Sequence, residues 1–273
     1  MPPRWLTALI VAFWLGTTGW LVYREVADRV HSGEPPRFAI DLTDEVSANT
    51  IAWNVLQKGE RVGMGRSWVR RRPDRTFELR SEFRFHEFSV LNVLKFRKMT
   101  SMYRVDADGH FQALAAEVYF ENNPVFDMLE VAGELRDGFV TPRVKCHSGR
   151  NVIDMPFKKF KVPERGSVLN PMHLVNKIHD LYDGQTWHIP LLDPFGAQFP
   201  GQSMHELKAE VSRDRLVWQN QATPCFRIDY REPGKKVTAR TWVRSNDGLV
   251  LQQEAAHEGQ EIILQREKLP ESK

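Results

Sequence analysis

Cysteine is scarce in this chain of 273 residues, which contains only Cys146 and Cys225. No Cys-x-x-Cys pair exists, so the sequence excludes a cysteine-rich zinc site and a thioredoxin-type redox motif. The two residues are compatible with one long-range disulfide in an oxidising compartment, or with two buried free thiols. Sequence separation alone does not decide between these alternatives, because it does not fix the distance between the two Cα atoms.

The usual catalytic and nucleotide-binding motifs are also missing. There is no Gly-Lys-Ser/Thr, Gly-x-Ser-x-Gly or His-Glu-x-x-His; His205-Glu206 lacks the second histidine. Cys146 and His147 are adjacent, which on a strand places them on opposite faces, and Asp106-Ala-Asp108-Gly109 lacks the glutamate that completes a calcium loop. We therefore predict a non-catalytic protein with no metal site and no cofactor.

Charge of one sign is not in excess. The chain has 38 basic and 35 acidic residues, a net charge of +3, which does not call for a nucleic-acid partner. Its hydrophobic content of 41% and charged content of 27% are ordinary for a globular protein and exclude global disorder.

One long hydrophobic run is present near the N-terminus. Trp5 to Tyr23 are nineteen residues without a charge, bracketed by Arg4 and Arg24, and a helix of that length spans the roughly 30 Å hydrocarbon core of a bilayer. A cleaved signal peptide and a buried helix are the alternatives. We predict a single-pass transmembrane anchor over 1–24 and a linker over 25–40. One extracytoplasmic β-rich domain follows over 41–270, which localises the protein to the periplasmic side of the cytoplasmic membrane.

The body of the chain alternates with a period of two. In the run from Thr76 to Phe88, four apolar side chains fall on one face and charged side chains on the other, which predicts a half-buried strand. Asp108-Gly109, Asp137-Gly138 and Asp247-Gly248 supply tight turns between such runs. About twelve strand candidates joined by short connections favour an antiparallel meander.

Two helices are predicted beside these strands. The first begins at Asn170-Pro171, continues with Val175, Ile178 and Tyr182 at helical spacing, and ends at Asp183-Gly184. The second is a short helix over 41–49. The predicted fold is therefore mainly β (α+β): a transmembrane helix, then a large curved antiparallel sheet, or half-barrel, closed by one or two helices.

A glycine pair and a run of arginines follow each other in one strand-like segment. Gly63-x-Gly65 has no helix after it, so it predicts a bulge or bend rather than a phosphate loop. Period two places Arg70 and Arg72 on one face and Arg71 on the other. The arginines are interpreted either as a charged strand edge or as contacts to anionic lipid headgroups. The headgroup candidates are Arg66, Arg70 and Arg72.

Several segments resemble those of a known group of proteins. The segments are 51–69 (IAWNVLQKGERVGMGRSWV), Asn170-Pro171, Gly184 to Pro190, Pro224 to Tyr230, Thr241 to Val243 and Asp247 to Val250. They resemble bacterial envelope proteins of uncharacterised function, often found beside transglutaminase-like proteins. The resemblance implies the fold of the lipoprotein carrier LolA and its receptor LolB, a half-barrel of antiparallel strands closed by helices. This chain differs from them in having a predicted transmembrane anchor.

These observations predict a membrane-anchored protein that binds a lipid, lipoprotein or other amphipathic ligand in a concave sheet, since an apolar sheet face must be covered by a helix or a ligand. The alternative is a structural or interaction module that binds an envelope protein partner, and an unrecognised enzyme is the third hypothesis. The residues predicted to line the ligand site are Phe77, Leu79, Phe83, Phe85 and Trp242.

Overall fold

The computed structural model describes residues 13–18, 20, 50–90, 94–107, 109–123, 125–156, 159–161, 174–191, 205–232, 234, 236–257 and 260–267. The chain divides into two units, Met1–Gly33 and Glu34–Lys273. In the first unit, 13–18 and residue 20 are helical. No helix within the described ranges is both long enough and apolar enough to cross a bilayer. Most of the predicted anchor (1–24), the linker (25–40) and the predicted helix over 41–49 lie outside those ranges.

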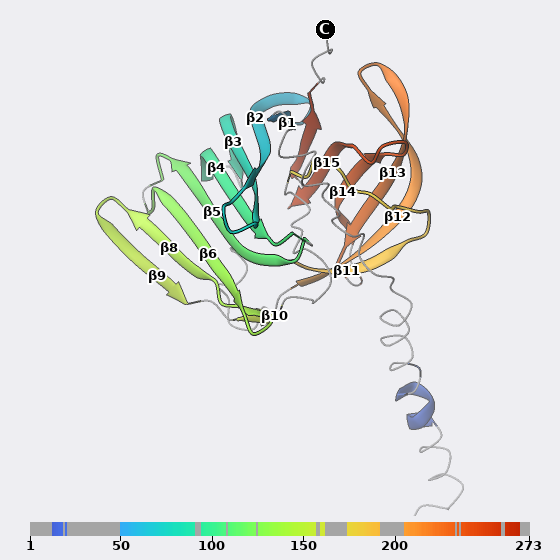
Figure 1. Cartoon of the computed structure of the whole chain (residues 1–273), viewed down its shortest axis with the longest axis horizontal. Helices are drawn as coiled ribbons and strands as arrows, with labels where there is room; N and C mark the ends of the chain where they lie inside the picture. The colour runs from blue at the N-terminus through green and yellow to red at the C-terminus, as the bar shows by residue number, and fades with distance from the viewer. Residues whose placement is uncertain are drawn as a thin grey trace, which may run out of the picture. The chain divides into compact units, whose positions relative to one another are not determined.

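The second unit is built from antiparallel strands (Figure 1). The described part contains sixteen of them, more than the sequence indicated. In chain order they are β1 (Ile51–Gln57), β2 (Glu60–Arg71), β3 (Phe77–Val90), β4 (Leu94–Val105), β5 (Phe111–Glu121), β6 (Met128–Arg136), β7 (Phe139–Val140), β8 (Arg143–Ser148), β9 (Asn151–Pro156), β10 (Phe160–Lys161), β11 (Thr186–Leu191), β12 (His205–Trp218), β13 (Gln221–Arg231), β14 (Val237–Arg244), β15 (Val250–His257) and β16 (Gln260–Arg266).

The predicted meander is confirmed, and it has one long-range joint. Along the main sheet the order is β10-β7-β6-β5-β4-β3-β2-β1-β16-β15-β14-β13-β12-β11, while β8 branches from β6 and carries β9. The first and last described strands, β1 and β16, pair over Trp53–Gln57, and this pairing joins the two halves of the meander. Tight turns make most of the other connections; Asp137 and Gly138, for example, have φ angles of 52° and 76°.

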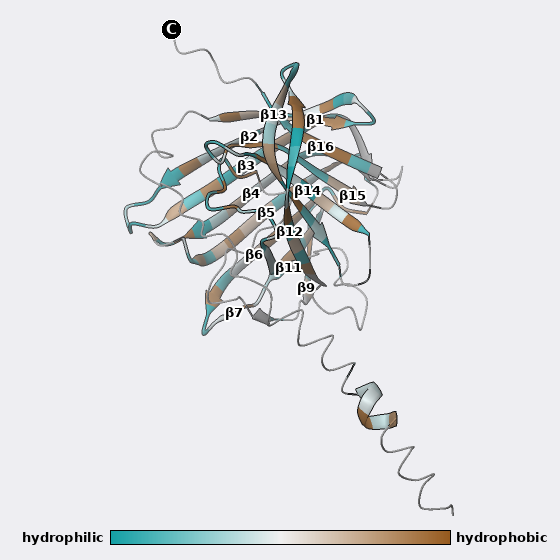
Figure 2. Ribbon diagram, turned by 90° about the vertical axis from the view of Figure 1, so that its right-hand side faces the viewer, coloured by the Kyte–Doolittle hydropathy of each residue, from teal (hydrophilic) through white to brown (hydrophobic). Residues whose placement is uncertain are grey.

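The two faces of the sheet differ in polarity, as Figure 2 shows by the alternation of brown and teal along the strands. We call the face that bears Phe83 the inner face. Through the pairing register, Phe83, Gly65 and Trp53 lie on that same face. Glu78, Arg80, Glu82 and Arg84 of β3 lie on the opposite, outer face. The predicted alternation in β3 is thus confirmed: Phe77, Leu79 and Phe83 are buried.

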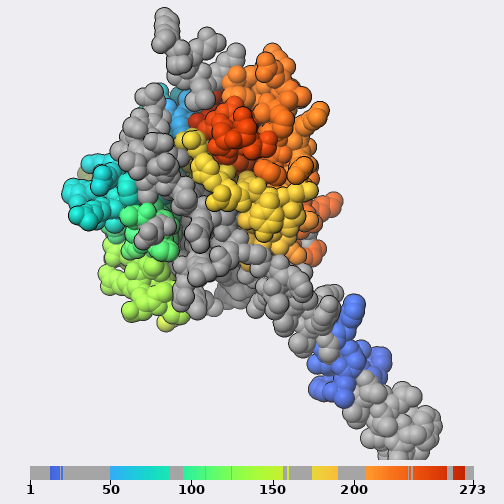
Figure 3. Space-filling model, turned by 45° about the vertical axis from the view of Figure 1, so that its right-hand side comes forward, coloured from blue at the N-terminus to red at the C-terminus, as the bar shows by residue number. Residues whose placement is uncertain are grey.

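The helix predicted from Asn170 onward does not form in its described part. Residues 174–182 contain no helix, and Lys177 forms an isolated antiparallel bridge with Leu249. Ile178 donates its backbone N–H to the carbonyl of Gly248 at 2.8 Å. The apolar side chains of Leu174 and Ile178 pack into the main inner-face cluster. In Figure 3 the segment 174–191, in yellow, lies against the orange strands β12 and β13.

The turn between β14 and β15 explains why this segment is extended. Gly248 has a φ of 71°, and a Cβ placed on it would lie 2.6 Å from the carbonyl oxygen of Ile178. The backbone of the turn therefore lies directly against the backbone of the segment. Hydrogen bonds to the sheet replace the hydrogen bonds of a helix. The apolar side chains of 174–182 cover the inner face without helical geometry.

Candidate functional site

A row of phenylalanine rings crosses the inner face from β3 to the loop after β5. Successive ring centroids are 6.1 Å apart for Phe83 and Phe85, 6.4 Å for Phe85 and Phe96, 5.2 Å for Phe96 and Phe120, and 4.8 Å for Phe120 and Phe126. These separations are typical of interacting aromatic side chains. Phe83 and Phe120 are buried, whereas Phe85, Phe96 and Phe126 are only half-buried. We call these five residues the phenylalanine row.

The glycine pair of β2 makes room for the first two rings. Gly65 lies opposite Phe83, and Gly63 lies opposite Phe85. A Cβ on Gly65 would come within 3.1 Å of the Phe83 ring, and one on Gly63 would lie 2.5 Å from the carbonyl oxygen of Arg84. Beside Gly63, the register of β1 against β2 shifts between Val55 and Leu56. The predicted bulge is confirmed, and its glycines allow close packing under the row.

A short loop holds the far end of the row. Asn123 Oδ1 accepts hydrogen bonds from the backbone N–H of Val125 at 2.8 Å and of Phe126 at 3.2 Å. These bonds fix the loop between β5 and β6 and place Phe126 edge-on to Phe120. Val125 leaves 65% of its surface exposed beside it. The row thus ends beside an exposed apolar side chain at the protein surface.

The basic side chains next to Phe96 in the sequence lie on the outer face, away from the row. Lys95 and Arg97 flank this ring in the sequence, and both are exposed. The register of β4 against β5 shifts between Phe96 and Lys98, so Arg97 occupies a bulge. Its guanidinium carbon lies 6.0 Å from the centroid of the Tyr119 ring. Within the described ranges, neither Lys95 nor Arg97 makes an ion pair. Tyr119 lies on the outer face, between the inner-face residues Val118 and Phe120, so Arg97 lies across the sheet from the row.

The five residues predicted to line a ligand site fall into three places. Phe83 and Phe85 belong to the row. Phe77 and Leu79 share the inner face but are buried in a separate small cluster with Val105. Trp242 lies on the outer face, because the register places it opposite Arg227 of β13. This placement corrects the prediction that it faces inward.

Trp242 has a structural role on the outer face. It is 8% exposed and packs with Cys225 and Leu251 in an outer-face cluster. Its Nε1 donates a hydrogen bond to Asp214 Oδ2 at 3.1 Å. Burial opposes ionisation of Asp214, but hydrogen bonds from Arg215, Trp242 and Arg227 together lower the pKa of its carboxyl.

The predicted headgroup arginines lie on or beside the outer face. Arg66 and Arg70 are both exposed, and Arg70 lies opposite Glu78. Arg72 donates from Nη1 to Glu78 Oε1 at 2.5 Å and also lies near Asp74, which satisfies its charge within the protein. Contact with headgroups remains a prediction, for which the exposed Arg66 and Arg70 are better placed than the ion-paired Arg72.

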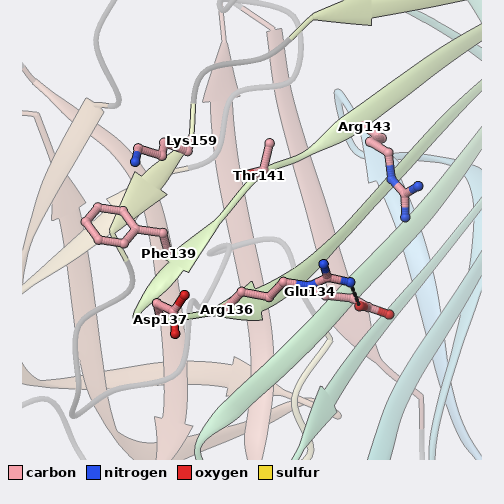
Figure 4. Close-up of a pocket in the computed structure, with 7 residues that line it drawn as sticks. All are labelled: Glu134, Arg136, Asp137, Phe139, Thr141, Arg143 and Lys159. Atoms are coloured by element: carbon pink, nitrogen blue, oxygen red, sulfur yellow. Dashed lines mark hydrogen bonds and ion pairs between the residues drawn. The ribbon is translucent and has the colours of Figure 1, made fainter.

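The structure contains a hollow that the sequence did not indicate (Figure 4). It forms at a fork, because β6 pairs with β8 up to Ala132 and with β7 from Leu135 onward. At this fork Gly133 leaves space for Val140, which a Cβ would approach to 2.7 Å. The hollow has a volume of about 560 Å³ and is lined by Glu134, Arg136, Asp137, Phe139, Thr141, Arg143 and Lys159.

Three basic and two acidic side chains line this hollow. Arg136 is bonded to Glu134 at 3.3 Å, and Lys159 Nζ lies 4.9 Å from the centroid of the Phe139 ring. Figure 4 shows Lys159 and Phe139 on one side and the Arg136 and Arg143 guanidinium groups on the other. The cations therefore do not converge on one point, and the arrangement suits a diffuse anionic contact rather than a tight anion site.

The remaining predictions concern cysteines and metals. Cys146 is half-buried and Cys225 is buried, and both are free. They lie with different hydrophobic clusters, so the structure contains the two free thiols and not the disulfide. Burial raises the pKa of both thiols. Across the described ranges, no group of three metal-ligating side chains comes together.

No protein-family model matches the chain, and no curated protein matches it. Among solved structures, the chain is similar to the crystal structure of a β-barrel-like protein of the domain of unknown function DUF1849 from Brucella abortus. The identity is 10%, the TM-score is 0.44, and the match covers 80% of this chain and 95% of that one. The lipoprotein carriers are not named among these findings, so that resemblance stays a prediction.

Proposed function

We propose that this protein binds the hydrocarbon part of an amphipathic ligand, a lipid or the acyl group of a lipoprotein, against the phenylalanine row. The observation that carries the proposal is the incomplete burial of Phe85, Phe96 and Phe126 within a continuous line of rings. Burying apolar surface is worth about 25 cal/mol per Å², so these rings gain free energy when an acyl chain covers them. Ligand sites of this kind are mainly apolar with a few polar groups that fix orientation.

The cellular setting of this activity comes from the sequence. The uncharged run from Trp5 to Tyr23 supports an anchored protein, and the resemblance to envelope lipid binders supports a domain on the periplasmic side. We further propose that the protein is a non-catalytic member of the envelope that holds its ligand near the membrane, as the half-barrel carriers do. Localisation is testable with a reporter fused to the C-terminus.

The test uses the full-length chain, purified in a mild detergent and transferred to amphipol. Native mass spectrometry will report lipid that co-purifies, and a fluorescent long-chain fatty acid will report binding. Phe126→Ala is the informative variant because this residue lies in a loop. We expect roughly tenfold weaker binding, the equivalent of about 1.4 kcal/mol of lost ring contact.

Val217→Ala is the matched control, because Val217 is an apolar side chain that is 70% exposed on β12, away from the row. It should bind the fatty acid as the wild type does. If the wild type carries no lipid and binds no fatty acid, or if both variants bind equally well, the proposal is wrong.

A further inference from the structure

Strand β9 is a free edge with apolar side chains on it. Within the described ranges β9 pairs only with β8, from Asn151 to Pro156, and Figure 1 shows it as the outermost strand of its end of the sheet. Val152 is 53% exposed and Ile153 is 59% exposed. Exposed apolar edges template pairing with another strand, and natural proteins normally avoid them.

The backbone of β9 is oriented for such pairing. Ser148 and Asn151 close the two-residue turn of Gly149 and Arg150, and in a two-residue hairpin the closing pair is hydrogen-bonded within the hairpin. Hydrogen-bonding direction then alternates along the strand. Val152 and Asp154 therefore direct their N–H and C=O groups toward the open edge. Pro156 occupies the next outward position, where its missing N–H costs the β8–β9 ladder nothing.

We propose that β9 pairs antiparallel with β9 of a second copy of this chain, which extends the sheet across a twofold axis. The charge pattern selects this partner. Arg150 and Asp154 lie two residues to either side of Val152, and both are exposed. Neither makes an ion pair in the described part of the chain. With Val152 facing its own copy, each arginine lies opposite the partner's aspartate, and the interface is self-complementary.

A second exposed edge on the same protein shows why this pattern matters. Val217 is 70% exposed on β12, and among the described residues β11 pairs only with the other half of that strand, between His205 and Glu210. The residues two before and two after Val217 are Arg215 and Gln219. Self-pairing there brings no opposite charges together. Of these two edges, β9 is thus the one whose charges favour pairing with a second copy of itself.

The first test is cysteine cross-linking of the full-length chain in a mild detergent. Val152→Cys places a thiol at the proposed twofold axis, and Val217→Cys places one on the control edge. Under a mild oxidant we expect most of the Val152→Cys protein to run as a disulfide-linked dimer on a non-reducing gel. The wild type, with its two native thiols, and the control variant should remain monomeric. Cross-linking of Val152→Cys that is no greater than that of Val217→Cys overturns the proposal.

The second test is charge exchange, read out by light scattering of the same preparations. Arg150→Asp and Asp154→Arg each place like charges opposite one another, so each variant alone should halve the protein mass of the particle. The double variant restores opposite charges and should restore the dimer. A double variant that remains monomeric, or a dimer that survives both single changes, excludes this register. Fatty-acid binding should be unaffected in all three variants, which separates this inference from the proposed function.

Discussion

Glu78 allows a sharp test of how the outer face is stabilised. Its carboxylate is 2% exposed and accepts hydrogen bonds from Arg72 Nη1 at 2.5 Å and from Arg80 Nε at 2.9 Å. Burial opposes the charged form, but the hydrogen bonds and charges of the two arginines outweigh it and lower the pKa of Glu78. The perturbation is Glu78→Gln, which keeps the shape of the side chain and removes its charge.

The size of the effect follows from the exposure of the partners. Breaking a fully buried ion pair costs about 3–5 kcal/mol, whereas exposed pairs contribute about 0–1 kcal/mol. The side chains of Arg72 and Arg80 are 41% and 37% exposed. Water therefore screens their charges and solvates the two guanidinium groups when the carboxylate is removed. We therefore expect Glu78→Gln to lower the free energy of unfolding by about 2 kcal/mol. For a domain of this size that corresponds to roughly 4–8 °C in Tm.

Glu134 is the matched control. It lies on the same outer face and also has two arginine neighbours, Arg136 at 3.3 Å and Arg104 at 4.0 Å, but its side chain is 53% exposed. Glu134→Gln should change Tm by no more than about 1–2 °C, as expected of exposed pairs. The assay is thermal unfolding of the full-length protein in detergent, followed by tryptophan fluorescence.

The pH dependence provides an independent check of sign. The folded-state pKa of Glu78 is lowered, so its contribution is fully present above the unfolded pKa of about 4.3 and is lost as pH falls through the folded pKa. The Tm difference between wild type and Glu78→Gln should accordingly be constant near neutral pH and shrink below about pH 4. Equal effects of the Glu78 and Glu134 changes, or a difference that grows in acid, would refute the reasoning.

Three further outcomes are expected. Gly63→Ala should destabilise the protein by about 1–3 kcal/mol, and by more than Gly65→Ala, because its new Cβ meets backbone rather than a ring; chemical unfolding of both variants measures this. Trp242→Phe should lower Tm through the lost hydrogen bond to Asp214 yet leave fatty-acid binding unchanged, since Trp242 lies on the outer face. A thiol reagent should modify Cys146 and Cys225 slowly at neutral pH and rapidly after unfolding, and a wild type that lacks free thiols would contradict this.

Features set by neighbouring residues were predictable from the sequence. The alternation of β3 and the turn at Asp137-Gly138 both depend on a few adjacent residues, and both form as expected.

The position of Trp242 was not predictable in this way. Alternation assigns faces only within one strand, and comparing β14 with β3 requires the register of every strand between them. That path includes a register shift between Trp242 and Val243, so counting residues cannot replace the observed pairing.

The predicted helix failed for a different reason. Val175 and Ile178 have helical spacing, and a helix was the simplest way to cover an apolar sheet face. The Asp247-Gly248 turn instead supplies backbone partners to this segment, through Gly248 to Ile178 and Asn176 to Val250. Hydrogen bonds to residues some seventy positions away compete with local ones, and no local pattern reports them. Tertiary pairing thus decided the conformation of 174–182.

The structural role of the glycine pair likewise depends on the register of the strands. Gly63-x-Gly65 first suggests a phosphate loop, but its role follows from lying opposite Phe85 and Phe83 across one ladder. Glycine in a strand interior is unfavourable, and a half-buried phenylalanine forgoes part of its burial free energy. A fold under selection for stability alone has no reason to combine both features in adjacent strands. Their combination is accounted for when the hydrocarbon part of an amphipathic ligand completes the surface of the row.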